Sequence, residues 1–104
     1  MASIRWTIGA QRDLGDVIEF IARSSPTFAA ATADRILQAG ERLRDHPRIG
    51  RVVPEFANLS IREIIVGNYR LIYRLYRQQV TVVAVVQGSR DLLRKIEKEP
   101  WDFG

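Results

Sequence analysis

The chain has 104 residues, of which 46% are apolar, and this size and composition suit one small domain built around one core. It contains no cysteine, which excludes a disulfide framework, a zinc–thiolate site and a thiol nucleophile. We therefore expect a single domain over residues 1–104, with no metal site and no cofactor.

The charge is positive, with 16 lysines and arginines against 12 acids and a formal net charge of +4. Most of these cations are arginines, whose planar fork matches phosphate and carboxylate groups better than an ammonium does. An anionic partner would follow: nucleic acid, a nucleic-acid machine or an acidic protein segment. The alternative is that a modest positive charge only keeps a small protein soluble.

From the pattern of the sequence we expect neither an export signal nor a membrane span. Its first residues alternate between polar and apolar and then become charged, without the basic and apolar regions of a signal peptide. No apolar run approaches the length of a membrane-spanning helix. We expect a cytoplasmic protein without membrane contact.

The first half of the chain predicts a strand and a helical hairpin. Residues 3–8 alternate, as in a strand, and residues 10–23 have apolar side chains at helical spacing. Ser25-Pro26 then supplies a capping hydroxyl and a proline at the first helical position. This second helix is expected to run to about Asp45, where Pro47 prevents its continuation. The side chains expected in the core are Trp6, Leu14, Val17, Ile18, Ile21, Phe28, Thr32, Ile36, Ala39 and Leu43.

After Ser60 the apolar period changes from 3.6 to 2, which predicts strands. Residues 61–66 and 69–76 flank Gly67-Asn68, a two-residue hairpin turn. A third strand covers residues 79–87, after a turn placed at Gln78-Gln79. The expected fold is α+β, with an N-terminal strand, an antiparallel helical hairpin, a mainly antiparallel sheet and a short C-terminal helix or tail.

This register predicts one apolar and one mixed face for the sheet. Arg70 and Arg74 point away from the helices, and Gln87 lies opposite Arg70. The remaining pairs expected between these two strands are Leu75 with Val82 and Tyr73 with Ala84. The residues expected on the mixed face are Glu63, Ile65, Arg70, Ile72, Arg74, Thr81, Val83, Val85 and Gln87. We expect this face to be an open docking surface, with cross-strand pairing of the arginines to Glu63 as the structural alternative.

The sequence also gives predictions for Arg62 and for the two aromatic residues of the tail. Arg62 falls on the core face where its strand starts, and we expect it to pair with a carboxylate there, such as Glu55. Trp101 and Phe103 follow Pro100 in the tail. Their rings are expected either to fold back on the sheet or to occupy a groove of a partner.

Several motifs, in this order, resemble the RelE/ParE superfamily of toxins from bacterial type II toxin–antitoxin modules. They are Trp6 before an acidic helix, SP at the start of a second helix, HPRIGRVVPEF, REIIVGNYRLIYRL and VVQGSRDL. The resemblance extends from Trp6 to about Leu93. It implies a cognate antitoxin, for which we expect a ribbon-helix-helix protein with an acidic tail that lies along the hairpin and approaches the arginines. Operator DNA would be reached only through the antitoxin.

The superfamily has two branches with different chemistry. RelE-like members resemble ribosome-dependent endoribonucleases that cleave mRNA, and ParE-like members inhibit DNA gyrase by binding it. Arg70 and Arg90 match cationic positions of the nucleases, and Glu55 resembles a catalytic base. However, Gln87 replaces a histidine common in relatives, and glutamine cannot exchange a proton near neutral pH. No credible general acid remains.

We therefore favour a ParE-like gyrase inhibitor that is not an enzyme. The alternatives are a ribosome-dependent nuclease, and an inactive relative that binds only its antitoxin and DNA. If the protein is a nuclease, the catalytic residues are Arg70, Arg90 and Glu55. The residues expected to bind the target or the antitoxin are Arg70, Arg74, Gln87, Arg90, Glu63 and Trp101.

Overall fold

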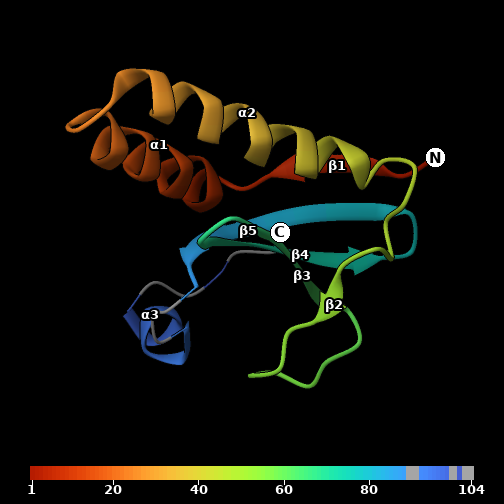
Figure 1. Cartoon of the computed structure of the whole chain (residues 1–104). Helices are drawn as coiled ribbons and strands as arrows, with labels where there is room; N and C mark the ends of the chain where they lie inside the picture. The colour runs from red at the N-terminus through yellow and green to blue at the C-terminus, as the bar shows by residue number, and fades with distance from the viewer. Residues whose placement is uncertain (89–91, 99–100, 102–104) are drawn as a thin grey trace.

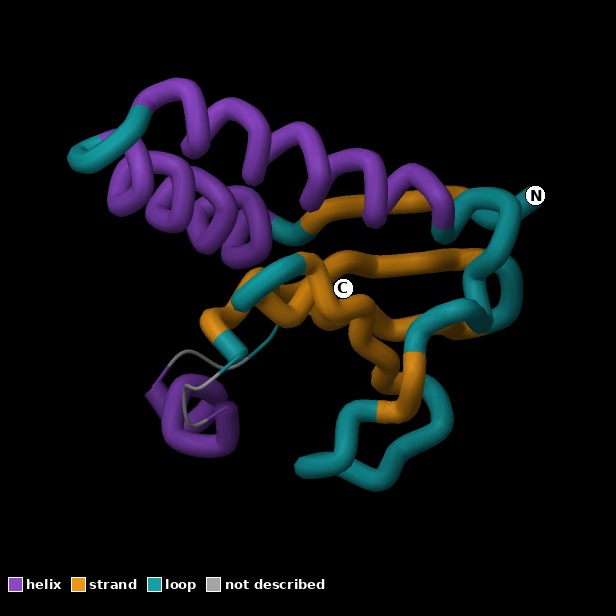
Figure 2. Tube along the Cα trace, viewed as in Figure 1, coloured by secondary structure: helices purple, strands orange, loops and turns teal. Residues whose placement is uncertain are grey.

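A computed structural model describes residues 1–88, 92–98 and 101. Five strands form one sheet in the order β1-β5-β4-β3-β2, and a hairpin of two helices packs on one face of it (Figure 1). Figure 2 shows the same arrangement, with the short third helix on the opposite side of the sheet. The α+β fold predicted from the sequence is confirmed. In chain order the elements are β1 (Ser3–Trp6), α1 (Ile8–Ala22), α2 (Pro26–Arg42), β2 (Arg51–Val52), β3 (Ile61–Val66), β4 (Tyr69–Tyr76), β5 (Gln79–Gln87) and α3 (Leu92–Lys98).

Both long helices begin at a hydroxyl cap. The Thr7 hydroxyl accepts a hydrogen bond from the Ala10 amide at 3.0 Å, so α1 begins at Ile8, where the sequence predicted the end of the strand. The Ser25 hydroxyl accepts from the Phe28 amide at 3.1 Å, which confirms the predicted start of α2. α2 ends at Arg42, earlier than expected.

The first core lies between the helical hairpin and the sheet. Ile36 and Ala39 of α2, Leu43 directly after it, and Leu71, Tyr73, Val80 and Val82 of the sheet contribute to it, all nearly or fully buried. Phe28, predicted to be buried, is 58% exposed instead. The buried stripe of α2 runs through Ala29 and Thr32, and Phe28 precedes Ala29 by one residue, which turns it about 100° away from that stripe.

The register between β3 and β4 agrees with the prediction, whereas that between β4 and β5 does not. Leu75 pairs with Val80 and not with Val82, because the turn is at Arg77-Gln78, one residue earlier than predicted. A bulge between Ile72 and Tyr73 then shifts the pairing again. Val85 and Gln87 consequently lie opposite Leu71 and Tyr69, on the helix face, and the prediction that they share a face with Arg70 is wrong.

The opposite face of the sheet is covered as well, which contradicts the predicted open surface. It carries a second apolar cluster: Val53, Ile61, Ile72, Val83, Ala84, Val86 and Leu92, with Phe56, Ile96 and Trp101 packed against them. The Trp101 ring meets the Phe56 ring edge-on, with 5.4 Å between centroids. Leu92 and Ile96 thus bring α3 against this face of the sheet (Figure 1), and Trp101 packs in the same cluster.

Candidate functional site

Four charged side chains form a continuous series of ion pairs on this second face, which we call the charge ladder: Arg51, Glu63, Arg70 and Glu55. Arg51 Nε donates to Glu63 Oε2 at 2.6 Å, and Arg70 Nε donates to Glu63 Oε1 at 2.6 Å. Both terminal nitrogens of Arg70 donate to the two Glu55 oxygens, each at 2.8 Å. Arg70 therefore has carboxylates along two sides of its guanidinium group.

The sheet and one loop position these groups. Glu63 faces Ile72 and Arg70 faces Ile65 in the β3–β4 register, so both charged side chains point to the second face as a diagonal pair. Glu55 comes from the turn after β2, where the Phe56 amide donates to the Val53 carbonyl at 3.1 Å. That turn folds Glu55 back over β4.

A second set of contacts fixes the loop before Arg51. The Tyr73 hydroxyl donates to the Pro47 carbonyl at 2.8 Å and accepts from the Gly50 amide at 3.0 Å. Gly50 is needed for this approach, since a β carbon there would lie 2.6 Å from the Tyr73 oxygen. The Arg62 guanidinium donates hydrogen bonds to two carbonyl oxygens, from Nε to Leu59 at 3.1 Å and from Nη1 to Gly50 at 3.0 Å. Its predicted partner Glu55 binds Arg70 instead, so that expectation is wrong.

The centre of the ladder is buried, and this corrects the predicted exposed arginine. Arg70 is 6% exposed and Glu63 is 1% exposed. The sequence pattern offered Glu63 as the one acid near Arg70 and Arg74. It did not predict that Glu55, fifteen residues before Arg70, is a second acid bound to Arg70. Of the two ends of the ladder, the Arg51 side chain is the more exposed, and no local pattern marked it, because β2 has only two residues.

The pKa shifts show what this arrangement does chemically. The hydrogen bonds from Arg70, the largest cause, lower the pKa of Glu55 to about 2. The same bonds raise the pKa of Arg70 above its ordinary value, although burial opposes the shift. Burial also raises the pKa of the Tyr73 phenol. The two ladder groups with resolved shifts, Glu55 and Arg70, therefore keep their charges near neutral pH.

The other candidate residues are dispersed. Arg74 is half-buried, with its guanidinium carbon 5.5 Å from the centroid of the Tyr76 ring. Gln87 is on the helix side and Trp101 packs against Phe56, which agrees with the fold-back alternative for that ring. Arg90 lies outside the described residues, as does Phe103.

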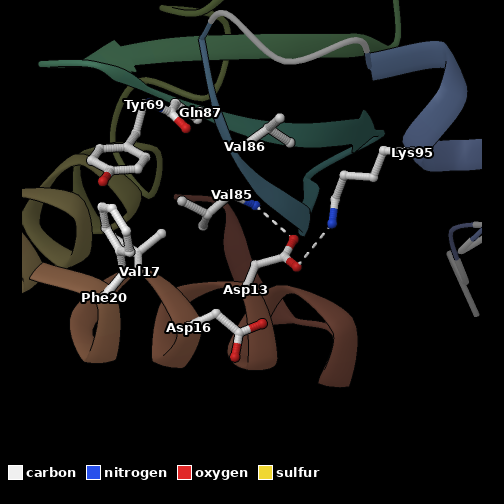
Figure 3. A pocket seen from close by; sticks show the side chains of 9 residues that line it. All are labelled: Asp13, Asp16, Val17, Phe20, Tyr69, Val85, Val86, Gln87 and Lys95. Carbon is white, nitrogen blue, oxygen red and sulfur yellow. Dashed lines mark hydrogen bonds and ion pairs between the residues drawn. The ribbon is translucent and has the colours of Figure 1, made fainter.

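A groove lies between α1 and the end of β5, and Figure 3 shows its lining. It encloses about 280 Å³, with Phe20, Tyr69 and Gln87 among its walls. The Asp13 carboxylate accepts from the Val85 amide at 3.0 Å and from Lys95 Nζ at 3.2 Å. This contact is possible because β1 pairs with β5 only as far as Val82. No pattern in the sequence marked Asp13, because its partners Val85 and Lys95 lie 72 and 82 residues away.

The described part of the chain offers neither a metal-binding cluster nor a membrane-spanning helix. In residues 1–88, 92–98 and 101, no group of three or more metal-binding side chains could hold a metal ion. No helix in the same residues is long and apolar enough to span a bilayer.

Comparison with protein families identifies the relatives of this chain. Residues 4–92 match the family described as the ParE toxin of the type II toxin-antitoxin system parDE. The chain belongs to the ParE toxin family. All four residues of the charge ladder lie within the match, whereas Lys95 and Trp101 lie beyond it. No curated protein matches the chain.

Solved structures with the same fold come from toxin–antitoxin systems. A chain of the chromosomal ParDE system of P. aeruginosa has a TM-score of 0.69 and 17% identity, covering 84% of this chain and 96% of its own. A chain of the toxin–antitoxin complex RelBE2 from Mycobacterium tuberculosis has a TM-score of 0.55 and 24% identity, with coverages of 83% and 96%. At these identities the comparison shows a shared fold, in agreement with the family match.

Proposed function

We propose that this ParE-family chain is a toxin that inhibits DNA gyrase by binding it, without cleaving nucleic acid, and that a cognate antitoxin neutralises it. The observation that carries the proposal is the bidentate pair between Glu55 and Arg70. Glu55 is the candidate base for RNA cleavage, and its two oxygens are both occupied by this arginine at 2.8 Å.

A general base is most effective when its pKa lies near the working pH. With a pKa of about 2, Glu55 is a weak proton acceptor at neutral pH. Arg70 cannot serve as the acid, because its pKa is raised further. The Tyr73 hydroxyl is buried and donates to the Pro47 carbonyl, so it is also a poor proton donor to a substrate. These constraints support action by binding over phosphodiester cleavage.

The antitoxin proposal rests on family membership and on the groove beside α1. Phe20, which is 64% exposed, lines the groove together with Tyr69. One apolar side chain of a partner helix could pack against these two rings. We infer a ribbon-helix-helix antitoxin whose acidic tail complements the positive net charge of the toxin. Operator DNA would then be bound through the antitoxin.

The experiment that tests this function is a brief induction of the protein in a bacterial host. New RNA 5′ ends are mapped, chromosomal breaks are scored, and an uninduced culture serves as the control. The proposal predicts intact mRNA, broken DNA and arrested growth. Cuts within translated codons would overturn it in favour of a ribosome-dependent nuclease. Normal growth with neither lesion, although the folded protein accumulates, would overturn it in favour of an inactive relative.

A further inference from the structure

Four segments of the chain meet at one end of the molecule, where the N-terminus and the β4–β5 turn lie (Figure 1). They are residues 1–3, 44–50, 59–62 and 75–78, and we call them together the loop end. Three backbone hydrogen bonds join them, each from an amide to a carbonyl: Ala2 to Arg44 at 2.8 Å, Ser3 to Gln78 at 2.9 Å and Leu75 to Ser60 at 2.8 Å. Residues far apart in the sequence are therefore neighbours at this end.

The Arg62 guanidinium joins the two remaining loops. Its Nε donates to the Leu59 carbonyl at 3.1 Å and its Nη1 donates to the Gly50 carbonyl at 3.0 Å. The Tyr73 hydroxyl fixes the 47–50 loop as well, through its bonds to the Pro47 carbonyl and the Gly50 amide. Both loops are held in place by the fold itself, so a partner that binds them has little loop ordering to offset.

These fixed loops carry large apolar side chains that the fold does not bury. Leu59 is 76% exposed and Ile49 is 58% exposed, and the Tyr76 ring is 55% exposed. Leu59 and Tyr76 each lie one residue from the hydrogen bond between Leu75 and Ser60, so they are close in space. None of the three exposed side chains belongs to either core cluster. Exposed apolar side chains on fixed loops at one end of a molecule are typical of a protein-interaction surface.

The loop end also carries more positive than negative charge. Its segments contain one acid, Asp45, against four arginines, which are Arg44, Arg48, Arg62 and Arg77. The neighbouring acid Glu41 of α2 is paired with Arg44 at 3.1 Å. Arg48 and Arg77 are the exposed arginines of the four. Arg77 has φ +56° in the β4–β5 turn, where glycine would be unstrained, so the turn keeps this arginine at a cost to the fold.

We propose that the protein binds its target through the loop end, and that the target presents a segment with apolar side chains beside carboxylates. Leu59 and Ile49 would pack against the apolar side chains. Arg48 and Arg77 would pair with the carboxylates, because oppositely charged surfaces complement each other in an interface. This inference rests on the proposed function, which makes gyrase the target.

The loop end is separate from the groove proposed for the antitoxin. Tyr69 and Gln87, in the walls of that groove, face each other across β4 and β5 at the ends remote from the turn that connects these strands. Tyr76 and Arg77 lie at the turn itself. Gyrase and the antitoxin would therefore contact opposite ends of the sheet.

The apolar contribution is tested with immobilised gyrase holoenzyme and the full chain in solution, by surface plasmon resonance, beside inhibition of supercoiling. Leu59→Ser and Ile49→Ser change exposed side chains, so both variants should remain folded. Each should weaken binding by about tenfold or more, and raise the concentration for half-inhibition by the same factor, because an aliphatic side chain buried in the complex is lost. The control is Phe28→Ser, since Phe28 is also 58% exposed but lies in the first turn of α2, at the tip of the hairpin. It should bind and inhibit like the unmodified protein.

The charge contribution is tested with two arginine variants. Arg48→Glu should slow association several-fold and make it less dependent on salt, whereas Arg12→Glu, at an exposed position on α1, should not. Arg77→Gly relieves the positive φ, so it should weaken binding although the fold becomes more stable. A merely structural role of Arg77 does not predict these opposite signs.

Three results would overturn this inference while the unmodified protein still binds gyrase. The first is unchanged binding and inhibition by folded Leu59→Ser and Ile49→Ser. The second is an equal loss in Phe28→Ser. The third is a dimer of the unmodified protein that Leu59→Ser makes monomeric without loss of inhibition, which would assign the loop end to a second copy of the chain. If the unmodified protein neither binds nor inhibits gyrase, the proposed function fails, and the assignment of this surface to gyrase fails with it.

Discussion

The two faces of the sheet are both buried, but by different means. On the helix face, Ile36 and Ala39 of α2 and Leu43 directly after it cover strand residues in an apolar layer. On the second face, Ile72 and Val86 are covered by the loop after β2, by α3 and by Trp101, and the charge ladder crosses the same layer. A strand arginine such as Arg70 can therefore lie in the interior, provided that acids from elsewhere in the chain meet it.

This difference has an energetic consequence. Truncating a buried apolar side chain lowers the free energy of unfolding in proportion to the volume removed. Neighbouring side chains partly collapse into the gap and limit this loss. A buried ion pair behaves differently, because removing one member leaves the other charged group without compensation. The ladder face should therefore be the more sensitive of the two to a single charge deletion.

The largest effect is expected for Glu63→Ala. It removes the acid shared by Arg51 and Arg70 and should lower the free energy of unfolding by about 3–5 kcal/mol, measured by urea denaturation. The control is Glu19→Ala, whose carboxylate lies 3.9 Å from Arg23 in a highly exposed pair and should cost less than about 0.5 kcal/mol. Equal small losses in both variants would mean that the ladder contributes no more than a surface pair.

A matched pair of truncations compares the two faces directly. Leu71 and Ile72 are adjacent in β4, are 1% and 0% exposed, and belong to the helix-face and second-face clusters respectively. Leu71→Ala and Ile72→Ala should each lower the free energy of unfolding by about 2–5 kcal/mol. If Ile72→Ala cost less than about 1 kcal/mol, the second face would be the open surface that the strand pattern predicted.

The ladder should also make stability depend on pH. The folded-state pKa of Glu55 is about 2, below the ordinary value of 4.5, so the unfolded chain binds its proton more readily. The stabilisation is present above about pH 4.5 and is lost as the pH falls toward 2. Urea midpoints measured across this range should fall more steeply for the unmodified protein than for Glu55→Gln, and parallel curves would contradict the assigned pKa.

The smallest effects concern the two turns and have opposite signs. Gly67→Ala places a β carbon at positive φ and should destabilise the fold by about 1 kcal/mol. Arg77→Gly removes the same strain and should stabilise it by about 1 kcal/mol. Thermal unfolding of both variants tests this contrast. A loss of stability in Arg77→Gly would show that the arginine serves the fold.

The sequence predicted those parts of the fold that depend on interactions between residues close together in the chain. The Ser25 cap, the helical periodicity and the Gly67-Asn68 turn act over a few residues and were predicted, whereas Thr7 was placed in the strand and Phe28 in the core. The register of β5 failed because residues 80–86 are buried on both faces, so their side chains show no alternation that would reveal a bulge.

The site was harder to predict for a related reason. Arg70 was identified as important, but its second acid, Glu55, comes from a loop fifteen residues away. Asp13 belongs to a helix whose pattern accounts for it as a surface residue. Contacts of this range follow from the packed structure and leave no periodic signal in the sequence.

The central claim is that Glu55 holds Arg70 and does not act as a catalytic base. The most direct test is inhibition of purified gyrase supercoiling by Glu55→Gln, beside cleavage of translated mRNA by the unmodified protein. Glutamine can still accept a hydrogen bond from Arg70, so the account predicts a folded variant that inhibits gyrase and an unmodified protein that leaves mRNA intact. If the unmodified protein cuts mRNA and folded Glu55→Gln does not, Glu55 is a catalytic base and the account is wrong.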